Sequence, residues 1–278
     1  MNTKKVWLIT GASKGLGLSL AKKLLDEGYK VAATSRTVES LEIEIGTSEN
    51  FLPLEVNITD ETSVSNAITK TLETFGTIDV VVNNAGYGQW GTLEELTDSE
   101  TRQNFDVNVF GALNVIRSVM PHFRNKKSGH IINIGSIAGF NGIFPSLGIY
   151  CATKYAMVGF TESLSAEAKE FGVKATIVYP GYFRTNFLDK STLSLAQNPI
   201  EDYTAARNSE HLHKTEIDGK QLGSPEKAAT AFIQLAESEN PPLHFFMGSD
   251  AFTMAYNKIE ILQNELRANE ALSKSTDF

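Results

Sequence analysis

Three side chains that could hold or transfer a proton lie in one stretch of the chain: Ser136, Tyr150 and Lys154. Apolar residues recur at helical spacing from Tyr150 to Phe171, and Gly148 is a helix breaker just before them. Residues i and i+4 share one face of an α-helix, so we expect Lys154 beside Tyr150. A nearby ammonium lowers the pKa of a phenol from about 10, so the pair predicts a tyrosine acting as general acid or base.

Ser136 follows a very apolar run, residues 131–134, which predicts a buried parallel strand. Its hydroxyl would emerge at the carboxyl end of that strand, where open α/β sheets bind ligands. A tyrosine and a lysine four residues apart also occur by chance on many helices. The elements around them therefore decide whether the three side chains form a site.

The chain alternates between five aliphatic-rich strands and helical patterns up to Tyr179. This alternation predicts an α/β fold, a doubly wound parallel sheet in a three-layer α/β/α arrangement. The 278 residues, 41% of them apolar, show no linker or repeat, so we expect one domain over residues 1–278. The expected strands are residues 6–9, 30–34, 51–56, 80–82 and 131–134, with a last one at 243–247.

Composition and charge favour a small-molecule partner. A net charge of −8 without a Lys or Arg stripe argues against nucleic acid. No apolar stretch is long enough for a signal peptide or a membrane span, so we expect a cytoplasmic protein with no membrane partner. The single cysteine, Cys151, excludes an intramolecular disulfide; on a helix it points about 100° away from Tyr150, so we expect it to pack in the core.

A glycine-rich turn, Thr10 to Gly17, connects the first strand to a helix that closes at Gly28. Its glycines let the backbone approach a pyrophosphate, and the helix start favours negative charge. The spacing G-x-x-x-G-x-G differs from the longer dinucleotide fingerprint G-x-G-x-x-G. Its place after a buried strand and before an amphipathic helix predicts a dinucleotide phosphate site.

Ser35 and Arg36 follow the second strand, where the adenosine ribose of a dinucleotide would lie. An acidic residue there would bind the 2′-hydroxyl of NAD, and none is present. Arg36 and Lys14 instead offer two cations for a 2′-phosphate, so we expect NADP, with NADPH preferred over NADH. The alternative is that Arg36 is a solvated loop charge.

Three asparagines, a neighbouring pair and a single one, are expected near the site. Asn83 and Asn84 precede Ala85 and Gly86 directly after the fourth strand, and their amides predict a buried organiser of the turn. Asn108 interrupts the apolar face of a helical pattern that runs over residues 96–127. It is either a satisfied core group or part of the site.

Together these motifs resemble the short-chain dehydrogenase/reductase family, in its single-domain branch built on an extended Rossmann fold. The resemblance implies an NAD(P)(H)-dependent oxidoreductase that interconverts a carbonyl and an alcohol by hydride transfer. The matching residues are Thr10-Gly11-x-x-x-Gly15-x-Gly17, Asn83-Asn84-Ala85-Gly86, Asn108, Ser136, Tyr150-x-x-x-Lys154 and Pro180-Gly181-x-x-x-Thr185.

The resemblance also implies a role for each residue. Ser136 would polarise the substrate oxygen, Tyr150 would deliver its proton, and Lys154 would lower the pKa of Tyr150 and hold the nicotinamide ribose. Asn108 would hold a water of the proton relay behind Lys154. The expected cofactor-binding residues are Gly11, Ser13, Lys14, Gly15, Leu16, Gly17, Ser35, Arg36, Asn57, Ile58, Asn84, Ala85, Gly86, Tyr150, Lys154, Pro180, Gly181, Phe183 and Thr185.

The chain departs from the family pattern at three places. The interval from Ser136 to Tyr150 is one residue longer than usual, which predicts a small bulge near Phe144-Pro145 that could reshape the pocket. Asn57 replaces the aspartate that usually meets the adenine amine, although its amide oxygen can still accept a hydrogen bond. Residues 245–251 replace the Gly-Gly ending of tetrameric members, so we expect a homodimer through the helices of Asn108 and Tyr150, with a tetramer possible. This ending resembles a subgroup labelled 17β-hydroxysteroid-dehydrogenase-like.

A long polar segment, residues 187–223, predicts a substrate lid with short helical pieces, and residues 251–278 predict a helical tail. His211 and His213 could suggest a metal, but we interpret them as solvated loop residues and expect no metal site. Side chains next to motif positions predict an aromatic pocket for a bulky hydrophobic ketone or aldehyde. They are Gln89, Trp90, Phe144, Tyr182, Phe183 and Phe187.

The sequence therefore predicts an NADP(H)-dependent carbonyl reductase, or equivalently an alcohol dehydrogenase. One alternative is a non-catalytic regulator that binds NADP(H) and senses its redox state, but such proteins usually lose the tyrosine or the lysine. Another is an epimerase or dehydratase, which usually has a larger C-terminal substrate domain.

Overall fold

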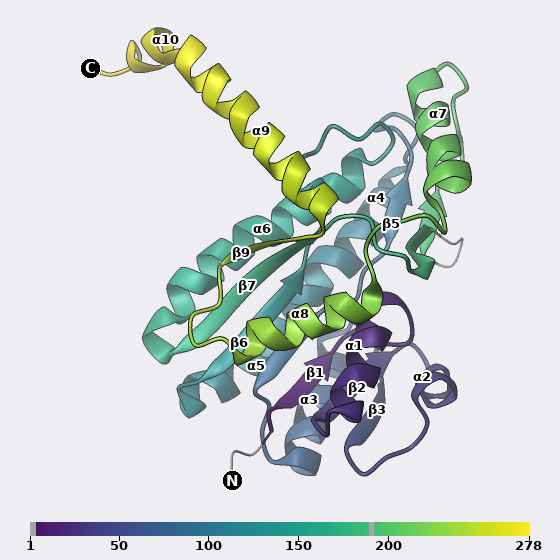
Figure 1. The fold of residues 1–278 in the computed structure, drawn as a ribbon, viewed down its shortest axis with the longest axis vertical. Coiled ribbons are helices and arrows are strands. Elements are labelled where there is room, and N and C mark those ends of the chain that lie inside the picture. Colours follow the sequence, from purple (N-terminus) through teal and green to yellow (C-terminus); the bar gives the residue numbers. More distant parts are fainter. Residues whose placement is uncertain (1–3, 189–191) are drawn as a thin grey trace.

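The computed structural model describes residues 4–188 and 192–278. Within them, seven strands form one fully parallel sheet in the order β3-β2-β1-β4-β6-β7-β9 (Figure 1). The predicted α/β class with a doubly wound parallel sheet is confirmed. The strands are β1 (Val6–Ile9), β2 (Lys30–Ser35), β3 (Phe51–Glu55), β4 (Val80–Asn83), β6 (Gly129–Ile134), β7 (Val173–Pro180) and β9 (His244–Met247).

Helices cover both faces of this sheet because its strands are apolar on both sides. Trp7 and Ile9 of β1 face one core cluster, whereas Leu8 between them faces the other. Helices α1 (Gly15–Asp26), α2 (Val38–Ile45) and α8 (Pro225–Glu237) cover the first face (Figure 1). Helices α3 (Glu61–Phe75), α5 (Gly111–Lys126) and α6 (Gly148–Ala168) cover the second.

Helix ends follow the signals in the sequence. The Asp60 carboxylate accepts the backbone N–H of Thr62 at 2.8 Å and begins α3, and Gly76, with a φ of 80°, ends it. Ser224 caps α8, with Pro225 in its first turn. These local signals place the helices without reference to tertiary contacts.

The sequence predicted one continuous helical pattern over residues 96–127. The structure instead has three consecutive helical segments there. A capping box between Thr97 and Glu100 begins α4 (Asp98–Phe105). A π-helical turn, η1 (Asp106–Phe110), then connects α4 to α5. A π turn adds one residue without changing the apolar character of the face, so spacing alone did not reveal it. Asn108 lies in this turn.

A small second sheet, which the sequence did not predict, stands above the main one. It pairs β5 (Gly88–Trp90) in parallel with β8 (Leu193–Leu195). The described part of the expected lid also contains η4 (Asn186–Leu188), α7 (Thr204–Leu212) and η5 (His213–Ile217), whereas residues 189–191 of that segment lie outside the described residues. Two further 3₁₀ turns are η2 (Ile137–Gly139) and η3 (Lys169–Phe171).

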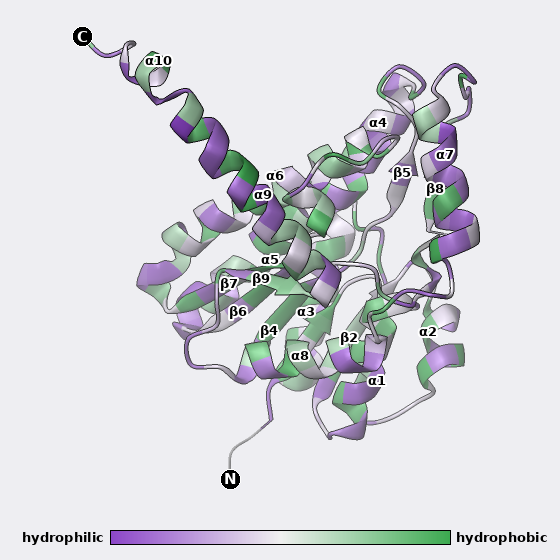
Figure 2. Cartoon of the chain, turned by 45° about the horizontal axis from the view of Figure 1, so that its top comes forward, coloured by the Kyte–Doolittle hydropathy of each residue, from purple (hydrophilic) through white to green (hydrophobic). Residues whose placement is uncertain are grey.

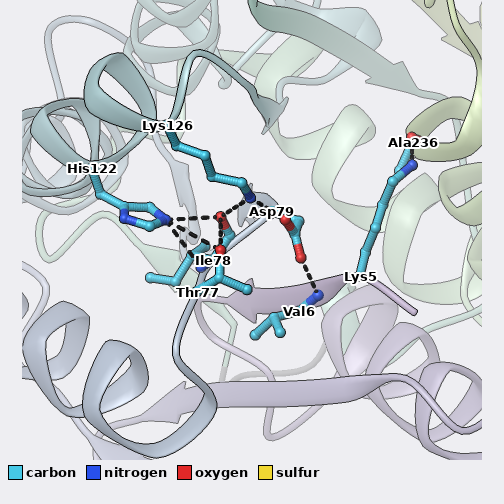
Figure 3. A network of polar contacts seen from close by, with 8 residues as sticks. All are labelled: Lys5, Val6, Thr77, Ile78, Asp79, His122, Lys126 and Ala236. Carbon is cyan, nitrogen blue, oxygen red and sulfur yellow. Dashed lines mark hydrogen bonds and ion pairs between the residues drawn. The ribbon is translucent and has the colours of Figure 1, made fainter. Parts of the chain in front are cut away.

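The amino ends of the strands are joined by a polar network around Asp79 (Figure 3). Its carboxylate accepts the N–H of Val6 at 2.7 Å and pairs with the ammonium of Lys126. Lys126 also donates to the carbonyl of Ile78 at 3.0 Å, and the His122 ring contacts the same backbone at 3.2 Å. The network therefore ties β1, the loop before β4 and α5 together.

The chain ends in a long helix, α9 (Ser249–Ala268), followed by α10 (Glu270–Lys274). Both extend away from the body of the molecule (Figure 1). No helix in the described part of the chain is long and apolar enough to cross a membrane.

Candidate active site

A cavity of about 590 Å³ opens at the carboxyl ends of the parallel strands. It extends from the turn between β1 and α1, past the ends of β2, β4 and β6, to α6 and the segment over residues 182–221. Every residue that the sequence assigned to the cofactor or to catalysis lines it, except Gly17 and Asn108. The sheet reverses its strand order between β1 and β4, and this edge is where α/β sheets bind ligands.

Ser136, Tyr150 and Lys154 come together on one wall of the cavity. The Lys154 ammonium lies 5.7 Å from the centre of the Tyr150 ring, as expected for neighbours on one helix face. It donates to the carbonyl of Ile134 at 2.8 Å, at the end of β6. The hydroxyl of Ser136, just beyond this strand, forms a hydrogen bond with that of Tyr150. Strand β6 and helix α6 therefore position the three groups.

The acidity of Tyr150 differs from the expectation. Burial raises the pKa of Tyr150 above its ordinary 10.0, and the hydrogen bond from Ser136 opposes this only in part. Burial also lowers the pKa of Lys154 to about 8. Desolvation disfavours both charged forms, and it is the largest cause of both pKa shifts. In this structure the predicted lowering is therefore wrong, and the phenol holds its proton at neutral pH.

Asn108 is a satisfied core group behind this wall. Its side chain accepts the N–H of Tyr87 at 3.0 Å and donates to the carbonyl of the same residue at 3.0 Å. Its second amide hydrogen points to the hydroxyl of Thr153 at 3.1 Å. Gly86 packs so closely that a Cβ there would lie 2.9 Å from the Asn108 oxygen. Asn108 therefore fixes the backbone that passes next to Lys154.

The asparagines after β4 organise the turn, as the sequence predicted. The Asn84 amide donates to the carbonyls of Thr10 at 3.0 Å and Gly11 at 2.9 Å. Asn83 donates to Asn133 at 2.8 Å, which links the ends of β4 and β6. Gly17 does not line the cavity, but a Cβ there would lie 2.5 Å from the Asn84 amide nitrogen. Its role is to leave room for this bond.

The other end of the cavity carries positive charge and an open helix start. The side chain of Lys14, the N-cap residue of α1, makes no capping hydrogen bond to the helix start, and the next residue, Gly15, has a φ of 60° and lines the cavity. Lys14 and Arg36 line the same region, and none of the described lining residues is an aspartate or glutamate. This end therefore suits an anion.

The far wall of the cavity holds His213, which the sequence interpretation placed wrongly in solvent. It is 6% exposed, and its ring meets that of Trp90 at a centroid distance of 4.7 Å. Its Nδ1–H donates to the carbonyl of Ser209 at 2.7 Å, so Nε2 accepts the Tyr182 hydroxyl at 2.8 Å. His211 is exposed, as expected. In the part of the chain that the structure describes, no three potential ligands gather as a metal site.

Comparison with known proteins settles the family. Residues 5–195 match the short chain dehydrogenase family. The chain belongs to this family. It is 34% identical to oxidoreductase BOA17 of Botryotinia fuckeliana over 93% of this chain and 94% of that protein. It is 35% identical to 3-ketodihydrosphingosine reductase of Bacteroides thetaiotaomicron, with 88% of each chain covered.

Solved structures agree with this assignment. A short-chain dehydrogenase from Streptomyces avermitilis superposes with a TM-score of 0.89 at 32% identity, over 98% of this chain and 100% of that one. The superposition therefore includes most of α9. ElxO with NADP bound superposes with a TM-score of 0.74 at 27% identity, over 90% of this chain and 99% of that one. The protein is thus an oxidoreductase, a short-chain dehydrogenase/reductase with the Rossmann-like fold of that family.

The cavity of this short-chain dehydrogenase fits a dinucleotide at most expected positions. Gly11 has a φ of 65°, and a Cβ there would lie 2.8 Å from the backbone of Ala85, so only glycine fits this turn. Asn57 fits less well. Its amide oxygen already accepts the N–H of Thr59 at 3.2 Å and its hydroxyl at 2.9 Å. That oxygen is therefore engaged within its own turn.

Sequence reasoning missed one residue that shapes the site, Asp250 in the first turn of α9. Its carboxylate accepts the N–H of Tyr182 at 2.7 Å, and a Cβ on Gly181 would overlap it. Asp250 therefore positions the loop after β7 in this dehydrogenase. It stands far from every motif in the sequence, and no local signal marks it.

The single cysteine of the dehydrogenase, Cys151, packs as predicted. It belongs to a buried cluster with Trp90, Ala138 and Leu147. Burial raises the pKa of its thiol to about 11. Cys151 is therefore a core residue and not a nucleophile.

Proposed function

We propose that this chain is an NADP(H)-dependent oxidoreductase that interconverts a bulky hydrophobic ketone or aldehyde and its alcohol. The observation that carries the proposal is the convergence of Ser136, Tyr150 and Lys154 at one end of a cavity whose other end holds Arg36. NADP(H), when bound, supplies or accepts the hydride.

Each catalytic side chain then has one task. In reduction, Ser136 holds the substrate oxygen, and Tyr150 gives it the proton that burial keeps on the phenol at neutral pH. Lys154 places positive charge beside the phenolate that remains and holds the nicotinamide ribose. Asn108 acts from behind through the backbone of Tyr87, because both its amide hydrogens are already engaged.

The preference for NADP rests on charge at the adenosine end. Arg36 and Lys14 line this region with no described carboxylate among the lining residues. An arginine can bind a phosphate bidentately, whereas the 2′-hydroxyl of NAD asks for an acidic acceptor. Solved relatives bind either cofactor, because one carries NADP and another, from Burkholderia phymatum, carries NAD.

The choice of a neutral, apolar substrate rests on the opposite wall. Aromatic and aliphatic side chains form it, and the lysines and arginine that line the cavity are those proposed for the cofactor. Its members are Trp90, Phe144, Leu147, Tyr182, Phe187 and Leu193. The expected segment over residues 187–223 supplies part of this wall, and we propose that it acts as the substrate lid. The keto group in the name of 3-ketodihydrosphingosine reductase agrees with this class.

The experiment is a kinetic panel. Oxidation of NADPH and of NADH is followed at the nicotinamide absorbance with aromatic, steroidal and aliphatic ketones and aldehydes. We expect turnover with NADPH on neutral hydrophobic members, and activity on steroids would also support the 17β-hydroxysteroid-dehydrogenase-like subgroup. Tight NADPH binding without turnover on any member would instead favour the redox-sensing regulator.

A further inference from the structure

Helix α9 leaves the body of the molecule after its first two turns. Ala251 and Ala255 are buried against Ile137, Phe140 and Phe246. From residue 259 to the end of the chain, every residue is exposed. An isolated helix shorter than about 12–15 residues is only marginally stable in water, and most helices in proteins depend on the packing of an apolar face. The outer half of α9 has no such packing within the described chain.

That outer half nevertheless carries an apolar stripe. Large apolar residues recur with the three- and four-residue spacing of one helix face. Green, hydrophobic bands alternate with purple ones along α9 (Figure 2). Ile259 and Leu262 are each 40% exposed and Leu266 is 71% exposed. With Ile259 and Leu266 at heptad position a, Leu262 falls at d, as in a two-stranded coiled coil. The stripe consists of Phe252, Tyr256, Ile259, Leu262 and Leu266, and we call it the α9 stripe.

We infer that the α9 stripe packs against the same stripe of a second copy of this chain, with the two helices antiparallel. The charged residues beside the α9 stripe favour a second copy of this chain in the antiparallel arrangement. Lys258 and Glu265 occupy successive g positions, and an antiparallel pair places Lys258 next to Glu265 of the partner subunit, twice by symmetry. A parallel pair would instead place Lys258 beside the uncharged Gln263 of the partner subunit, so the attraction would be lost.

The charge of the helix argues against a lipid surface as the occupant. Four acidic residues and three basic ones lie between residues 249 and 274, and the two basic residues of α9 itself, Lys258 and Arg267, lie about 180° apart around the helix. Surface-bound helices in membranes are usually rich in Lys and Arg on the polar face. Self-pairing uses both signs of charge, whereas an anionic membrane would use only one.

Pairing would also reach the cavity of each subunit. Asp250, in the first turn of α9, holds the N–H of Tyr182, whose ring lines the cavity. A second copy that packs against α9 would therefore also restrain the loop after β7. This loop contributes Tyr182 to the proposed substrate wall.

The test is the molecular mass of the full chain by sedimentation velocity and equilibrium. Leu262→Glu places a charge within the α9 stripe and should halve the mass of the assembly, whether from dimer to monomer or from tetramer to dimer. Ile261→Glu is the matched control. Ile261 is 46% exposed on the same helix but about 200° around from Ile259, so its variant should keep the wild-type mass. Both residues lie outside the core, so circular dichroism should show an intact fold.

A charge exchange tests the antiparallel arrangement. Lys258→Glu should raise the dissociation constant about tenfold, because two attractive pairs become repulsive. Adding Glu265→Lys to it should return the constant to about the wild-type value. A monomeric wild-type chain, an unchanged mass for Leu262→Glu, or a double variant no tighter than the single one would overturn the inference. So would a monomer that floats with phosphatidylcholine vesicles.

Discussion

Tyr150 and Lys154 show how burial sets the chemistry of a single pair. Both side chains are buried in the cavity wall. Burial raises the pKa of the Tyr150 phenol and lowers the pKa of the Lys154 ammonium to about 8. A protonated phenol is the form that a reductase needs at the start of its cycle, and an amine that still carries its proton at pH 7 can stabilise the phenolate that follows. The pair therefore suits reduction at neutral pH.

Replacing Tyr150 with phenylalanine tests this assignment. Tyr150→Phe keeps the ring in its cluster but removes the proton donor, so kcat should fall by about 10²–10⁴-fold. NADPH affinity, measured by fluorescence titration, should stay within about threefold of the wild type, because the phosphate end of the cavity is untouched. Wild-type turnover in this variant would refute the mechanism.

Arg36 tests the choice of cofactor. Arg36→Asp replaces a cation by the kind of acid that binds a ribose hydroxyl, so kcat/KM should move from NADPH towards NADH by about 10²-fold or more. The ratio of the two specificity constants is the readout. Arg36→Gln is the control, because it should weaken NADPH without improving NADH. An unaltered ratio in Arg36→Asp would contradict the assignment of a 2′-phosphate site.

Residues inside motifs could be placed from the sequence, because their neighbours fix them. Asn84, for example, follows a strand directly and must meet the next strand end. His213 and Asp250 could not, because their positions depend on contacts with distant segments. The pKa of Tyr150 also depends on three-dimensional burial, which helical spacing does not report.

At the scale of elements, the segment over the cavity is fastened by a buried carboxylate. Glu95 accepts the N–H of Ile200 at 2.7 Å and pairs with Arg207 at 2.7 Å. Its side chain is fully buried, so these bonds act in a low-dielectric setting. Together with the pairing of β5 and β8, they hold α7 against the body.

Glu95→Gln should loosen this segment. The variant leaves Arg207 with only the more distant carboxylate of Glu210, at 3.8 Å, which costs on the order of 1–3 kcal/mol locally. We expect faster hydrogen exchange over residues 193–217 and a several-fold higher substrate KM. Glu94→Gln is the matched control, since Glu94 is exposed and contacts only the Tyr203 hydroxyl among the bonds described. Equal exchange in the two variants would show that Glu95 does not fasten the segment.

Six of the seven strands of the main sheet were predicted, because they are largely apolar runs between turn signals, whereas β7 was not given a range of its own. The ends of α3 and α8 followed from Asp60, Gly76 and Ser224. Strands β5 and β8 were not predictable, since three residues carry no period and their pairing joins segments far apart in the chain. The π turn at Asn108 was hidden because it keeps the helical direction.

At the scale of the whole molecule, the polar network that joins the strands and the candidate active site lie at opposite ends of the main sheet. The Asp79 network joins the amino ends of the strands, and the cavity opens at their carboxyl ends. His130, the second residue of β6, is buried near the amino ends of the strands. It donates through Nε2 to the hydroxyl of Thr176 at 2.9 Å, because that hydroxyl donates onward to the carbonyl of Pro242. Burial, with Lys174 and Lys5 nearby, lowers the pKa of His130 to about 3.

His130 makes stability depend on pH. Between pH 6.5 and about 3 the unfolded chain binds a proton here that the folded chain does not, so stability is lost as pH falls through this window. Chemical denaturation at pH 6, 5 and 4 should show the wild type losing about 1 kcal/mol per pH unit more than His130→Asn. Parallel pH profiles for the two proteins would exclude a neutral His130.

The burial of Cys151 makes the chain suitable for site-specific labelling at an introduced cysteine. With no other cysteine in the sequence, and with this one in the core at a thiol pKa of about 11, the folded chain should react with thiol reagents as if it had none. A cysteine introduced anywhere on the surface would then be the sole labelling position. A dye or spin probe on α9 or α7 could be attached in one step, without first deleting the native thiol.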